Sequence, residues 1–341
     1  MGQPPHRRGS PVADGGSWPG SPTVITIDTR FSGHHGIARY AREVTGRLSG
    51  LEWSGLSSGR NPSSPAGLLD GFRLGRSTRL FYSPGFNPLA SAVPQLLTLH
   101  DLIHLRPGLP NRSRRLAYYE ALIRPVIRRL GRVLTVSETS AEEIRRWVRD
   151  DTVEVINAGN GCSSEFTPGA AASRPRRPYF LYVGALRPHK NVPTMLTALA
   201  GLPEARLIVV SPDHTRFSTA LARHGLSQRA EVLSGLDDRR LASLYRGAAT
   251  TVLPSTAEGF GLPAVESLSC GTPVVYWQGC KSVREICAGY GTAVESATDV
   301  GQWRVALRDA LEQPQPVSGF DTGRFCWNRV ADRVGGVLRG L

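Results

Sequence analysis

Two glutamates flank a glycine-rich segment in the second half of the chain. Glu258 lies directly before Gly259 and Gly261, and Glu266 lies eight positions after Glu258. A carboxylate repels phosphate, whereas it accepts hydrogen bonds well from hydroxyl groups. The pattern therefore predicts that Glu258 binds the hydroxyls of a sugar and that Glu266 binds the ribose of a nucleotide, as acids do in dinucleotide-binding folds. The alternative is that both acids are solvated surface charges.

The segment between these acids also predicts an anion site. A buried strand is expected to end at Ser255, and Pro263 suits the first turn of the helix that follows. The backbone amides of Phe260, Gly261 and Leu262 would then point outward from the start of that helix, where an anion binds favourably. Glycine on either side of Phe260 lets the backbone approach a ligand that a side chain would block.

A second cluster of candidate residues follows a strand expected over 179–184. That strand ends on Gly184, and Arg187 and Lys190 come shortly after it in the segment GALRPHKN. Only Lys190 and Lys281 are lysines among 41 basic residues. A compact ammonium is a suitable point charge for phosphate. We predict that Lys190 and Arg187 bind phosphate beside Gly184; the alternative is that both are surface charges.

The elements that position these residues are those of an α/β fold. Short β-branched runs alternate with helical stretches, which is typical of parallel sheets covered by helices. The strands of a first sheet are expected at 23–28, 80–83, 95–100, 133–137 and 153–157, and those of a second at 179–184, 206–211, 230–235, 250–255 and 272–277. Ligands of such sheets bind at the carboxyl ends of the strands, which is where both clusters lie.

The chain is expected to form two domains of similar size. A Pro-, Ala-, Ser- and Arg-rich stretch over 165–178 has the composition of a linker. We place the first domain at 22–166, the second at 167–320 and a terminal amphipathic helix at 321–341. The residues before them, 1–21, lack the apolar core of a secretory signal, so we expect a disordered extension.

Composition and charge exclude several classes of protein. The net charge is +13, but the chain has neither a basic stripe with interleaved aromatic residues nor a known nucleic-acid module. It also lacks G-x-G-x-x-G and the P-loop sequence, which removes the main support for a nicotinamide dehydrogenase or a P-loop NTPase. Five cysteines without a C-x-x-C spacing fit a reduced, cytoplasmic protein. No apolar run approaches the roughly 20 residues that cross a bilayer.

The most basic stretch runs over 112–149. Its apolar residues recur every three or four positions, which predicts a packed helix with a solvated basic face; these residues are Leu116, Tyr119, Ile123, Ile127 and Leu130. The alternative is that this basic face of the first domain contacts an anionic acceptor or the inner membrane surface peripherally.

The segment PSTAEGFGLPAVESLSCGTPVV (254–275) resembles the E-x7-E motif of retaining glycosyltransferases with the GT-B fold. The resemblance extends over most of the chain. The matching segments are RFSGHHGIARYARE (30–43), LLTLHDLIHL (96–105), VLTVSETSAEEI (133–144), VINAGNGCSSEFTP (155–168), YFLYVGALRPHKN (179–191) and GLDDRRLASLYRGA (235–248). The order and spacing of these matches is more specific than any single one.

The resemblance implies two Rossmann-like domains that face each other across a cleft, with the last helix crossing back onto the first domain. It implies that Glu258 lies near the donor sugar, that Glu266 binds the ribose and that Lys190 binds the donor diphosphate. His100 matches the first-domain histidine that approaches the reacting sugar, although a histidine after a strand is often structural. Gly36 matches the glycine loop that faces the diphosphate.

The reaction implied by this family expels a nucleoside diphosphate while the sugar becomes oxocarbenium-like. Cations and backbone dipoles must then stabilise the leaving group. Because the chain has no D-x-D sequence, we expect no metal and no other cofactor; Lys190, Arg187 and the amides after Glu258 take that role. No carboxylate is assignable as a covalent nucleophile, so we expect front-face attack with retention of configuration.

The donor is expected to be a nucleotide-diphosphate sugar. The V-G-x-L-x-P-x-K-N form resembles the mannosyltransferase-like branch, so GDP-mannose is favoured, and UDP- and dTDP-sugars stay open. The acceptor is expected to be a hydroxyl compound that the first domain binds. Four positions depart from the family pattern around the diphosphate: Ala38, Ala185, His189 and Ser211. Two further functions stay open, a nucleotide-sugar epimerase or hydrolase on the same fold, and a non-catalytic nucleotide-sugar-binding protein.

Overall fold

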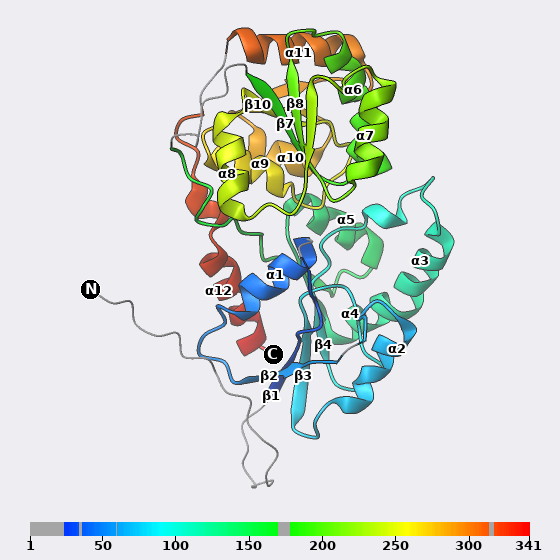
Figure 1. Cartoon of the computed structure of the whole chain (residues 1–341). Coiled ribbons are helices and arrows are strands. Elements are labelled where there is room, and N and C mark those ends of the chain that lie inside the picture. The colour runs from blue at the N-terminus through cyan, green and yellow to red at the C-terminus, as the bar shows by residue number, and fades with distance from the viewer. Residues whose placement is uncertain (1–23, 34–35, 59, 170–177, 314–316) are drawn as a thin grey trace, which may run out of the picture.

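The computed structural model describes residues 24–33, 36–58, 60–169, 178–313 and 317–341. They form two α/β domains that lie one above the other in Figure 1, joined where the chain crosses between them. The extension expected over 1–21 lies outside the described residues. None of the described helices is both long and apolar enough to cross a bilayer.

The first domain is built on four parallel strands in the order β2-β1-β3-β4. They are β1 (Val24–Asp28), β2 (Trp53–Leu56), β3 (Thr78–Ser83) and β4 (Gln95–Leu97). Strands β5 (Arg132–Thr135) and β6 (Glu154–Asn157) form a separate parallel pair. A single bridge, Thr98 to Leu134, connects this pair to the end of β4. The first sheet expected from the sequence is therefore divided into a four-stranded and a two-stranded sheet.

The second domain is built on six parallel strands in the order β12-β11-β10-β7-β8-β9. They are β7 (Tyr179–Val183), β8 (Arg206–Val210), β9 (Ala230–Leu233), β10 (Thr250–Leu253), β11 (Val274–Trp277) and β12 (Thr292–Val294). Strands β7 and β10 are neighbours at the centre, with Phe180 opposite Thr250. Because the two strands are parallel, the loops after them, which carry Lys190 and Glu258, emerge at the same edge of the sheet.

Helices cover both sheets (Figure 1). Those of the first domain are α1 (Gly36–Thr45), α2 (Pro65–Leu68), α3 (Arg112–Tyr118), α4 (Arg124–Leu130) and α5 (Glu138–Val148). Those of the second are α6 (Val192–Ala200), α7 (His214–Arg223), α8 (Asp238–Gly247), α9 (Leu262–Ser269), α10 (Lys281–Cys287) and α11 (Val300–Glu312). This alternation confirms the α/β class expected from the sequence.

The basic stretch of the first domain is not one continuous helix. A π-helical turn, η3 (Tyr119–Ile123), separates α3 from α4. The turn inserts extra backbone without ending the helix, and it places Tyr119 and Ile123 in the core at 1% and 0% exposure. Such π turns are frequent at functional sites because they redirect neighbouring side chains.

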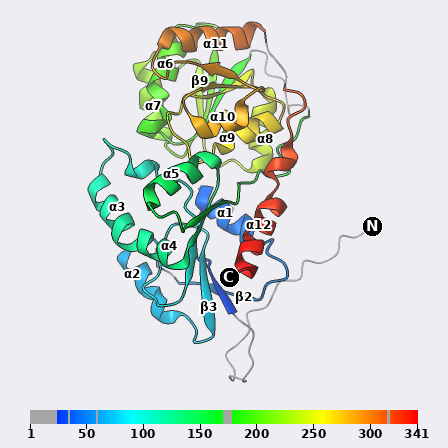
Figure 2. The same cartoon turned by 180° about the vertical axis from the view of Figure 1, so that it is seen from behind.

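The last helix, α12 (Trp327–Arg339), lies on the first domain beside α1, as expected from the sequence (Figures 1 and 2). Its apolar face enters the core of that domain with Trp327, Val330, Val334 and Leu338. The chain therefore crosses between the domains twice. The two crossings lie next to each other, because Cys162 and Cys326 form a parallel β-bridge.

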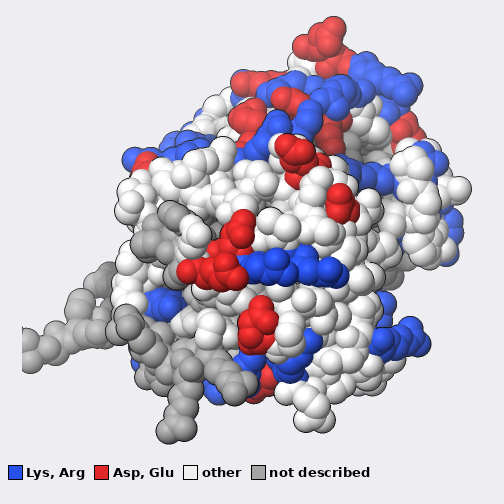
Figure 3. All heavy atoms as spheres, turned by 90° about the horizontal axis from the view of Figure 1, so that it is seen from above, with Lys and Arg blue, Asp and Glu red and all other residues white. Residues whose placement is uncertain are grey.

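Basic and acidic side chains are interspersed on the face of the molecule where α11 lies (Figure 3). Mixed charge of this kind makes no strong field of one sign at that face. The net charge of the chain therefore does not by itself mark an anion site there.

Candidate active site

The loop between β10 and α9 forms the centre of the candidate site. Strand β10 ends at Leu253, two residues before the end expected from the sequence, and Ser255 in the loop after it is fully buried. Gly261 precedes α9 with φ +114°, a left-handed conformation that favours glycine, and a Cβ there would lie 3.2 Å from Val283 Cγ2. Because the N-cap of α9 is a glycine, no side chain caps the first turn of the helix. The backbone amides of Phe260, Gly261 and Leu262 lie at this uncapped helix start.

Glu258 forms a tight ion pair with Lys190. The Lys190 Nζ atom lies 2.6 Å from Oε1 and 2.8 Å from Oε2 of Glu258, and Ser255 Oγ donates to Oε1 at 2.6 Å. The side chains of Lys190 and Glu258 are only 17% and 12% exposed. The structure thus brings together three residues that the sequence placed in one site, although Lys190 and Glu258 are 68 positions apart.

Local backbone contacts hold these two loops together. The short helix η4 (Pro188–Lys190) follows β7, and the His189 carbonyl accepts bonds from Thr256 N at 2.7 Å and Thr256 Oγ1 at 3.1 Å. Burial, with the nearby Lys190 charge, lowers the pKa of His189. Gly184 at the end of β7 donates its N–H to the β8 strand. Arg187 precedes η4 and is exposed.

The glycine-rich loop touches the first domain. A Cβ on Gly259 would lie 2.9 Å from the carbonyl oxygen of His100 and 2.8 Å from Asp101 Oδ2. The carbonyl of Gly259 accepts hydrogen bonds from Ser137 Oγ at 2.6 Å and Ser140 Oγ at 3.0 Å, at the start of α5. Only glycine permits this approach, so the residue type at 259 sets how closely the domains meet.

His100 lies at the same interface. Its Nε2 atom is 3.0 Å from the carbonyl oxygen of Pro84, and its ring packs edge-on against Tyr40 with centroids 4.9 Å apart. Its own carbonyl accepts from Ser140 Oγ at 3.0 Å. These contacts fix the histidine at the domain boundary, next to the loop that carries Glu258.

Glu266 is buried and bound to protein groups on both oxygens. Its exposure is 4%. Tyr245 OH donates to Oε2 at 2.9 Å, and the guanidinium of Arg39, from the first domain, donates to Oε1 at 3.2 Å. Arg39 also bonds Asp238 at 2.8 Å. Burial raises the pKa of Glu266, although Arg39 and Tyr245 oppose that shift.

Arg39 is a site residue that the sequence analysis did not single out. It lies three positions after Gly36, the first residue of α1, within the segment 30–43 that resembles the family's glycine loop. Gly36 is exposed, and a Cβ there would meet nothing within 4 Å. Phe260 was expected to bind donor through its backbone, and its ring packs against Phe325 with centroids 5.9 Å apart. The ring therefore faces the chain segment before α12.

A cavity of about 240 Å³ opens between the domains directly beside Glu258. Charged side chains from both domains line it: Arg106, Glu142, Glu143, Arg146, Glu258 and Lys281. The cavity leaves room for polar groups of a ligand to reach Glu258 from the domain interface. Among the described residues, no group of three or more His, Cys, Asp or Glu side chains is arranged to hold a metal ion.

Comparison with known proteins agrees with this architecture. Residues 164–319 match the family model described as glycosyl transferases group 1. The O-antigen chain mannosyltransferase RfbU of Salmonella typhimurium is 25% identical over 252 residues, which are 72% of this chain and 69% of that protein. A D-inositol 3-phosphate glycosyltransferase of Mycobacterium sp. strain KMS is 32% identical over 207 residues, 55% of this chain and 46% of the relative. The chain thus spans about half the length of that relative.

Solved structures resemble the whole chain. Sucrose-phosphate synthase from Thermosynechococcus elongatus superposes with a TM-score of 0.76 at 18% identity, covering 93% of this chain and 98% of that one. Anabaena Alr3699/HepE, in complex with UDP and glucose, gives a TM-score of 0.71 at 15% identity, covering 94% and 100%. The chain therefore has the GT-B fold, and its residues 164–319 are similar to the glycosyl transferases of group 1.

Proposed function

We propose that this protein is a retaining, metal-independent glycosyltransferase that moves a sugar from a nucleotide-diphosphate sugar to a hydroxyl acceptor. The observation that carries the proposal is the buried Lys190–Glu258 pair at the edge of the second sheet, against the first domain. A cation for a leaving diphosphate and an acid for sugar hydroxyls are the two groups that this reaction needs on the donor side.

The ion pair explains how the site holds both charges before a donor enters. A donor diphosphate would form an ion pair with the ammonium of Lys190 in place of Glu258. The oxygens of Glu258 would then be free to accept hydrogen bonds from the hydroxyls of the sugar. In the reaction, the bond from the sugar anomeric carbon to the phosphate oxygen breaks. A new bond to the acceptor oxygen forms on the same face, and the acceptor proton passes to the departing phosphate. Arg187 and the amides at the start of α9 would bind the negative charge that develops on the leaving group.

Glu266 is proposed to bind the ribose of the donor nucleotide. Arg39 and Tyr245 each donate one hydrogen bond to a different oxygen of Glu266, so each oxygen keeps a further lone pair for a ribose hydroxyl. Because Arg39 belongs to the other domain, its contact with Glu266 would link nucleotide binding to the domain interface. Gly36, at the start of the same helix, would face the diphosphate.

GDP-mannose is the favoured donor. RfbU and the O-antigen chain mannosyltransferase B of Escherichia coli, which is 28% identical over 233 residues, are both named as mannosyltransferases. UDP- and dTDP-sugars remain alternatives, because the HepE structure contains UDP and glucose.

Thermal-shift measurements with GDP, UDP and dTDP test the nucleotide site. The preferred nucleotide at 100 times its dissociation constant should stabilise the native protein by about 2.7 kcal/mol. Lys190→Met, which keeps the length of the side chain and removes its charge, should remove most of this shift, while Arg223→Ala, which removes an exposed arginine at the end of α7, should leave it unchanged. A chain that none of the three nucleotides stabilises would contradict the proposal.

The stereochemistry is tested by proton NMR of the first glycosidic product, before any anomer equilibrates. The product should keep the anomeric configuration of the donor, and turnover should continue in the presence of EDTA. An inverted product, or turnover that needs no acceptor, would refute the retaining transferase in favour of another mechanism.

A further inference from the structure

Helix α5 of the first domain and helix α10 of the second domain pack against each other at the domain boundary (Figures 1 and 2). Neither helix carries a group to which the mechanism above assigns a step. Both, however, donate hydrogen bonds to the backbone of the loop that carries Glu258. The contact between the two helices therefore bears on how that loop is held.

Two consecutive carbonyl groups of this loop, those of Glu258 and Gly259, are bound by different domains. Ser282 Oγ, on α10, donates to the carbonyl of Glu258 at 2.8 Å. Ser137 Oγ and Ser140 Oγ, at the start of α5, donate to the carbonyl of Gly259 at 2.6 and 3.0 Å. Because adjacent carbonyls are bound from the two sides of the domain boundary, the orientation of the peptide between them depends on how α5 is placed against α10.

The carboxylate of Glu285, three positions after Ser282 on α10, joins the two helices. Its Oε1 atom accepts a hydrogen bond from the N–H of Thr139 at 2.8 Å and another from the Thr139 hydroxyl, and its Oε2 atom accepts from the N–H of Glu138 at 3.3 Å. Glu138 and Thr139 are the first two residues of α5, whose N–H groups have no carbonyl partner within the helix. The helix dipole favours a negative charge at the same place. The second domain thus supplies an acceptor for the exposed amides of a first-domain helix.

The start of α5 also sets the direction of the two serine hydroxyls. Ser137 is the N-cap residue, and its Oγ atom accepts the N–H of Ser140 at 3.0 Å, which leaves its proton for the carbonyl of Gly259. Ser140 Oγ lies 3.0 Å from the carbonyl oxygens of both Gly259 and His100, so its single proton is shared between them. The start of α5 therefore holds the His100 segment and the Glu258 loop next to each other.

An ion pair between Lys281 and Glu142 also joins these helices. The Lys281 Nζ atom lies 3.9 Å from Glu142 Oε2, and both side chains are more than half exposed. Exposed pairs of this kind contribute about 0–1 kcal/mol. The main attachment of α10 to α5 is therefore the carboxylate of Glu285.

We propose that Glu285 is a positioning residue for the proposed transfer reaction. By joining α10 to the start of α5, it holds the Glu258–Gly259 peptide in the orientation that the reaction uses. Its effect passes through the first amides of α5 to Ser137 and Ser140, and from their hydroxyls to the carbonyl of Gly259. The inference rests on the proposed function, because the loop that Glu285 positions carries the acid assigned to the donor sugar.

Kinetics of the full chain with Glu285→Ala test this role. Because a small misplacement of a reacting group slows the chemical step, the turnover number should fall by about 10- to 100-fold. Isothermal titration with GDP, UDP and dTDP should give the same dissociation constants as for the parent protein, because neither Lys190 nor Glu266 is held by α5. Glu285→Gln keeps one oxygen acceptor and should recover part of the turnover. Arg284→Ala, which removes the exposed neighbour of Glu285 on the same helix, should match the parent in both measurements.

Hydrogen exchange followed by mass spectrometry gives a measurement that does not depend on activity. In Glu285→Ala, the N–H groups of Glu138 and Thr139 lose their acceptor, so peptides that cover 137–141 should exchange faster. Peptides that cover 256–261 should also exchange faster, because the loop loses its fixed support. Peptides from α6 and α11 should exchange as in the parent protein, which checks that the fold is kept.

A combination of variants tests the route through the serine hydroxyls. Ser137→Gly with Ser140→Ala removes both donors from the carbonyl of Gly259, and glycine is tolerated at an N-cap position. If Glu285 acts through these hydroxyls, the further change Glu285→Ala should cause little additional loss of turnover. Losses that multiply would mean that Glu285 acts by another route, and the proposal would be wrong.

Full turnover of Glu285→Ala would also overturn the proposal. A loss of nucleotide affinity as large as the loss of turnover would do the same, because Glu285 would then act on donor binding. A rise of hydrogen exchange throughout both domains would instead assign the residue to overall stability and contradict a positioning role. Faster exchange confined to 137–141 and 256–261, in a chain that transfers no sugar from GDP-, UDP- or dTDP-sugars, would support the role of Glu285 in holding the loop and refute the transferase function separately.

Discussion

The Lys190–Glu258 ion pair joins the two charges on which the proposed chemistry depends. Both side chains are mostly buried and contact each other at 2.6 Å. Removal of one partner leaves the other charge buried without an opposite charge, which lowers the stability of the folded protein. Substitutions here must therefore preserve shape as far as possible, so that a loss of activity is not confused with a loss of folding.

Glu258→Gln keeps the size of the side chain and removes its charge. We expect turnover to fall by about 100-fold or more, because sugar hydroxyl contacts that strengthen in the transition state are weakened. Release of nucleoside diphosphate measures the rate. Glu312→Gln, at the exposed end of α11, is the matched control. A near-normal rate for Glu258→Gln would remove the proposed role of this acid.

Glu266 gives a pH-dependent prediction. Burial raises the pKa of Glu266 above its ordinary value of 4.5, so the native carboxyl holds a proton at a pH where the unfolded chain has released it. Its contribution to stability is therefore largest below that ordinary value and declines as pH rises through the raised pKa. Glu266→Gln cannot ionise and should lose this decline.

The melting temperatures of the parent protein and Glu266→Gln, measured between pH 4 and 8, check this. The melting temperature of Glu266→Gln should rise relative to that of the parent protein as pH rises above 4.5, the ordinary pKa of this acid. Parallel profiles would mean that Arg39 and Tyr245 fully offset the cost of burying the charge.

Residues in strand-end loops could be predicted from the sequence, and residues joined across domains could not. The position of Lys190 and Glu258 follows from two parallel strands and the loops after them. Arg39 contacts Glu266 only because the first domain packs over α9. Asn87 Oδ1 and Tyr119 OH, which are buried and have no hydrogen-bond partner among the described residues, depend on the packing between α2 and α3. Only a three-dimensional arrangement reveals these contacts.

At the scale of elements, the strands with an apolar or β-branched run were predicted, and β2 and β12 were not. Strand β2 has the sequence WSGL with no β-branched residue, and Thr292 and Ala293 of β12 are exposed. Neither has a run that distinguishes it from a loop. The π turn at Tyr119 was also missed, because a spacing of three or four residues continues through it.

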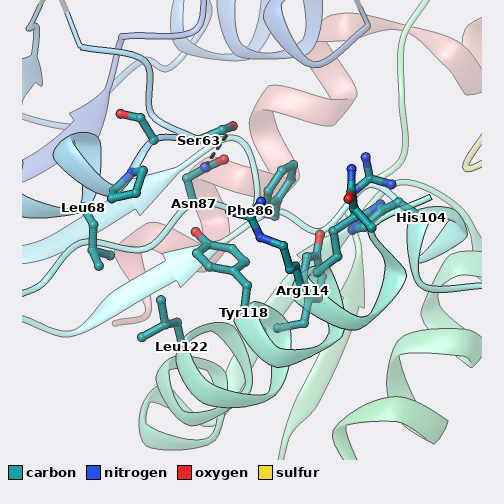
Figure 4. Close-up of a pocket in the computed structure, with 13 residues that line it drawn as sticks. Ser63, Leu68, Phe86, Asn87, His104, Arg114, Tyr118 and Leu122 are labelled. Carbon is teal, nitrogen blue, oxygen red and sulfur yellow. Dashed lines mark hydrogen bonds between the residues drawn. The ribbon is translucent and has the colours of Figure 1, made fainter. Parts of the chain in front are cut away.

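A buried charge cluster fixes α2 to the end of β1. Arg30 bonds Asp28 at 2.7 Å, Asp70 at 2.8 Å and the carbonyl of Gly67 at 2.9 Å, and all three charged side chains are 0% exposed. Burial alone would raise the pKa of Asp70, but hydrogen bonds from Ser58 and Arg30 outweigh it and hold the pKa below its ordinary value. The cluster therefore positions α2, whose Pro65 and Leu68 line a cavity together with Tyr118 of α3 (Figure 4).

Asp70→Asn should destabilise the protein by about 3–5 kcal/mol at neutral pH, because Arg30 keeps a buried charge with fewer partners. Since the pKa of native Asp70 is lowered, the contribution of its charge is present above the ordinary value of 3.8 and is lost as pH falls through the lowered pKa. The penalty should therefore shrink in acid. Urea unfolding at pH 7 and at pH 2.5 measures it, with Asp309→Asn on α11 as an exposed control; an equal penalty at both pH values would contradict the argument.

At the scale of the whole molecule, the approach of the two domains depends on Gly259. A Cβ there would press on the backbone oxygen of His100 and on Asp101. Gly259→Ala should force the domains apart by a few tenths of an ångström or more. Because small misplacements of reacting groups are costly, turnover should fall by up to about 100-fold while each domain stays folded.

Steady-state kinetics together with thermal melting separate these effects. Gly336→Ala, on α12 where a Cβ would meet nothing within 4 Å, should leave both turnover and melting unchanged. Full activity of Gly259→Ala would show that the close contact of Gly259 with His100 and Asp101 is not needed for turnover.

The adjacent crossings at Cys162 and Cys326 limit how the protein can open. The N–H of Cys162 donates to the carbonyl of Phe325 at 2.7 Å, so the two connecting segments are fastened to each other. One connection alone would allow the upper half to swivel in any direction. Two connections that are bonded to each other favour rotation of one domain against the other about a single axis, which runs along the two crossing segments. They oppose sliding and twisting of the domains. Any movement of this kind would return Glu258 and His100 to the same mutual position when the domains close.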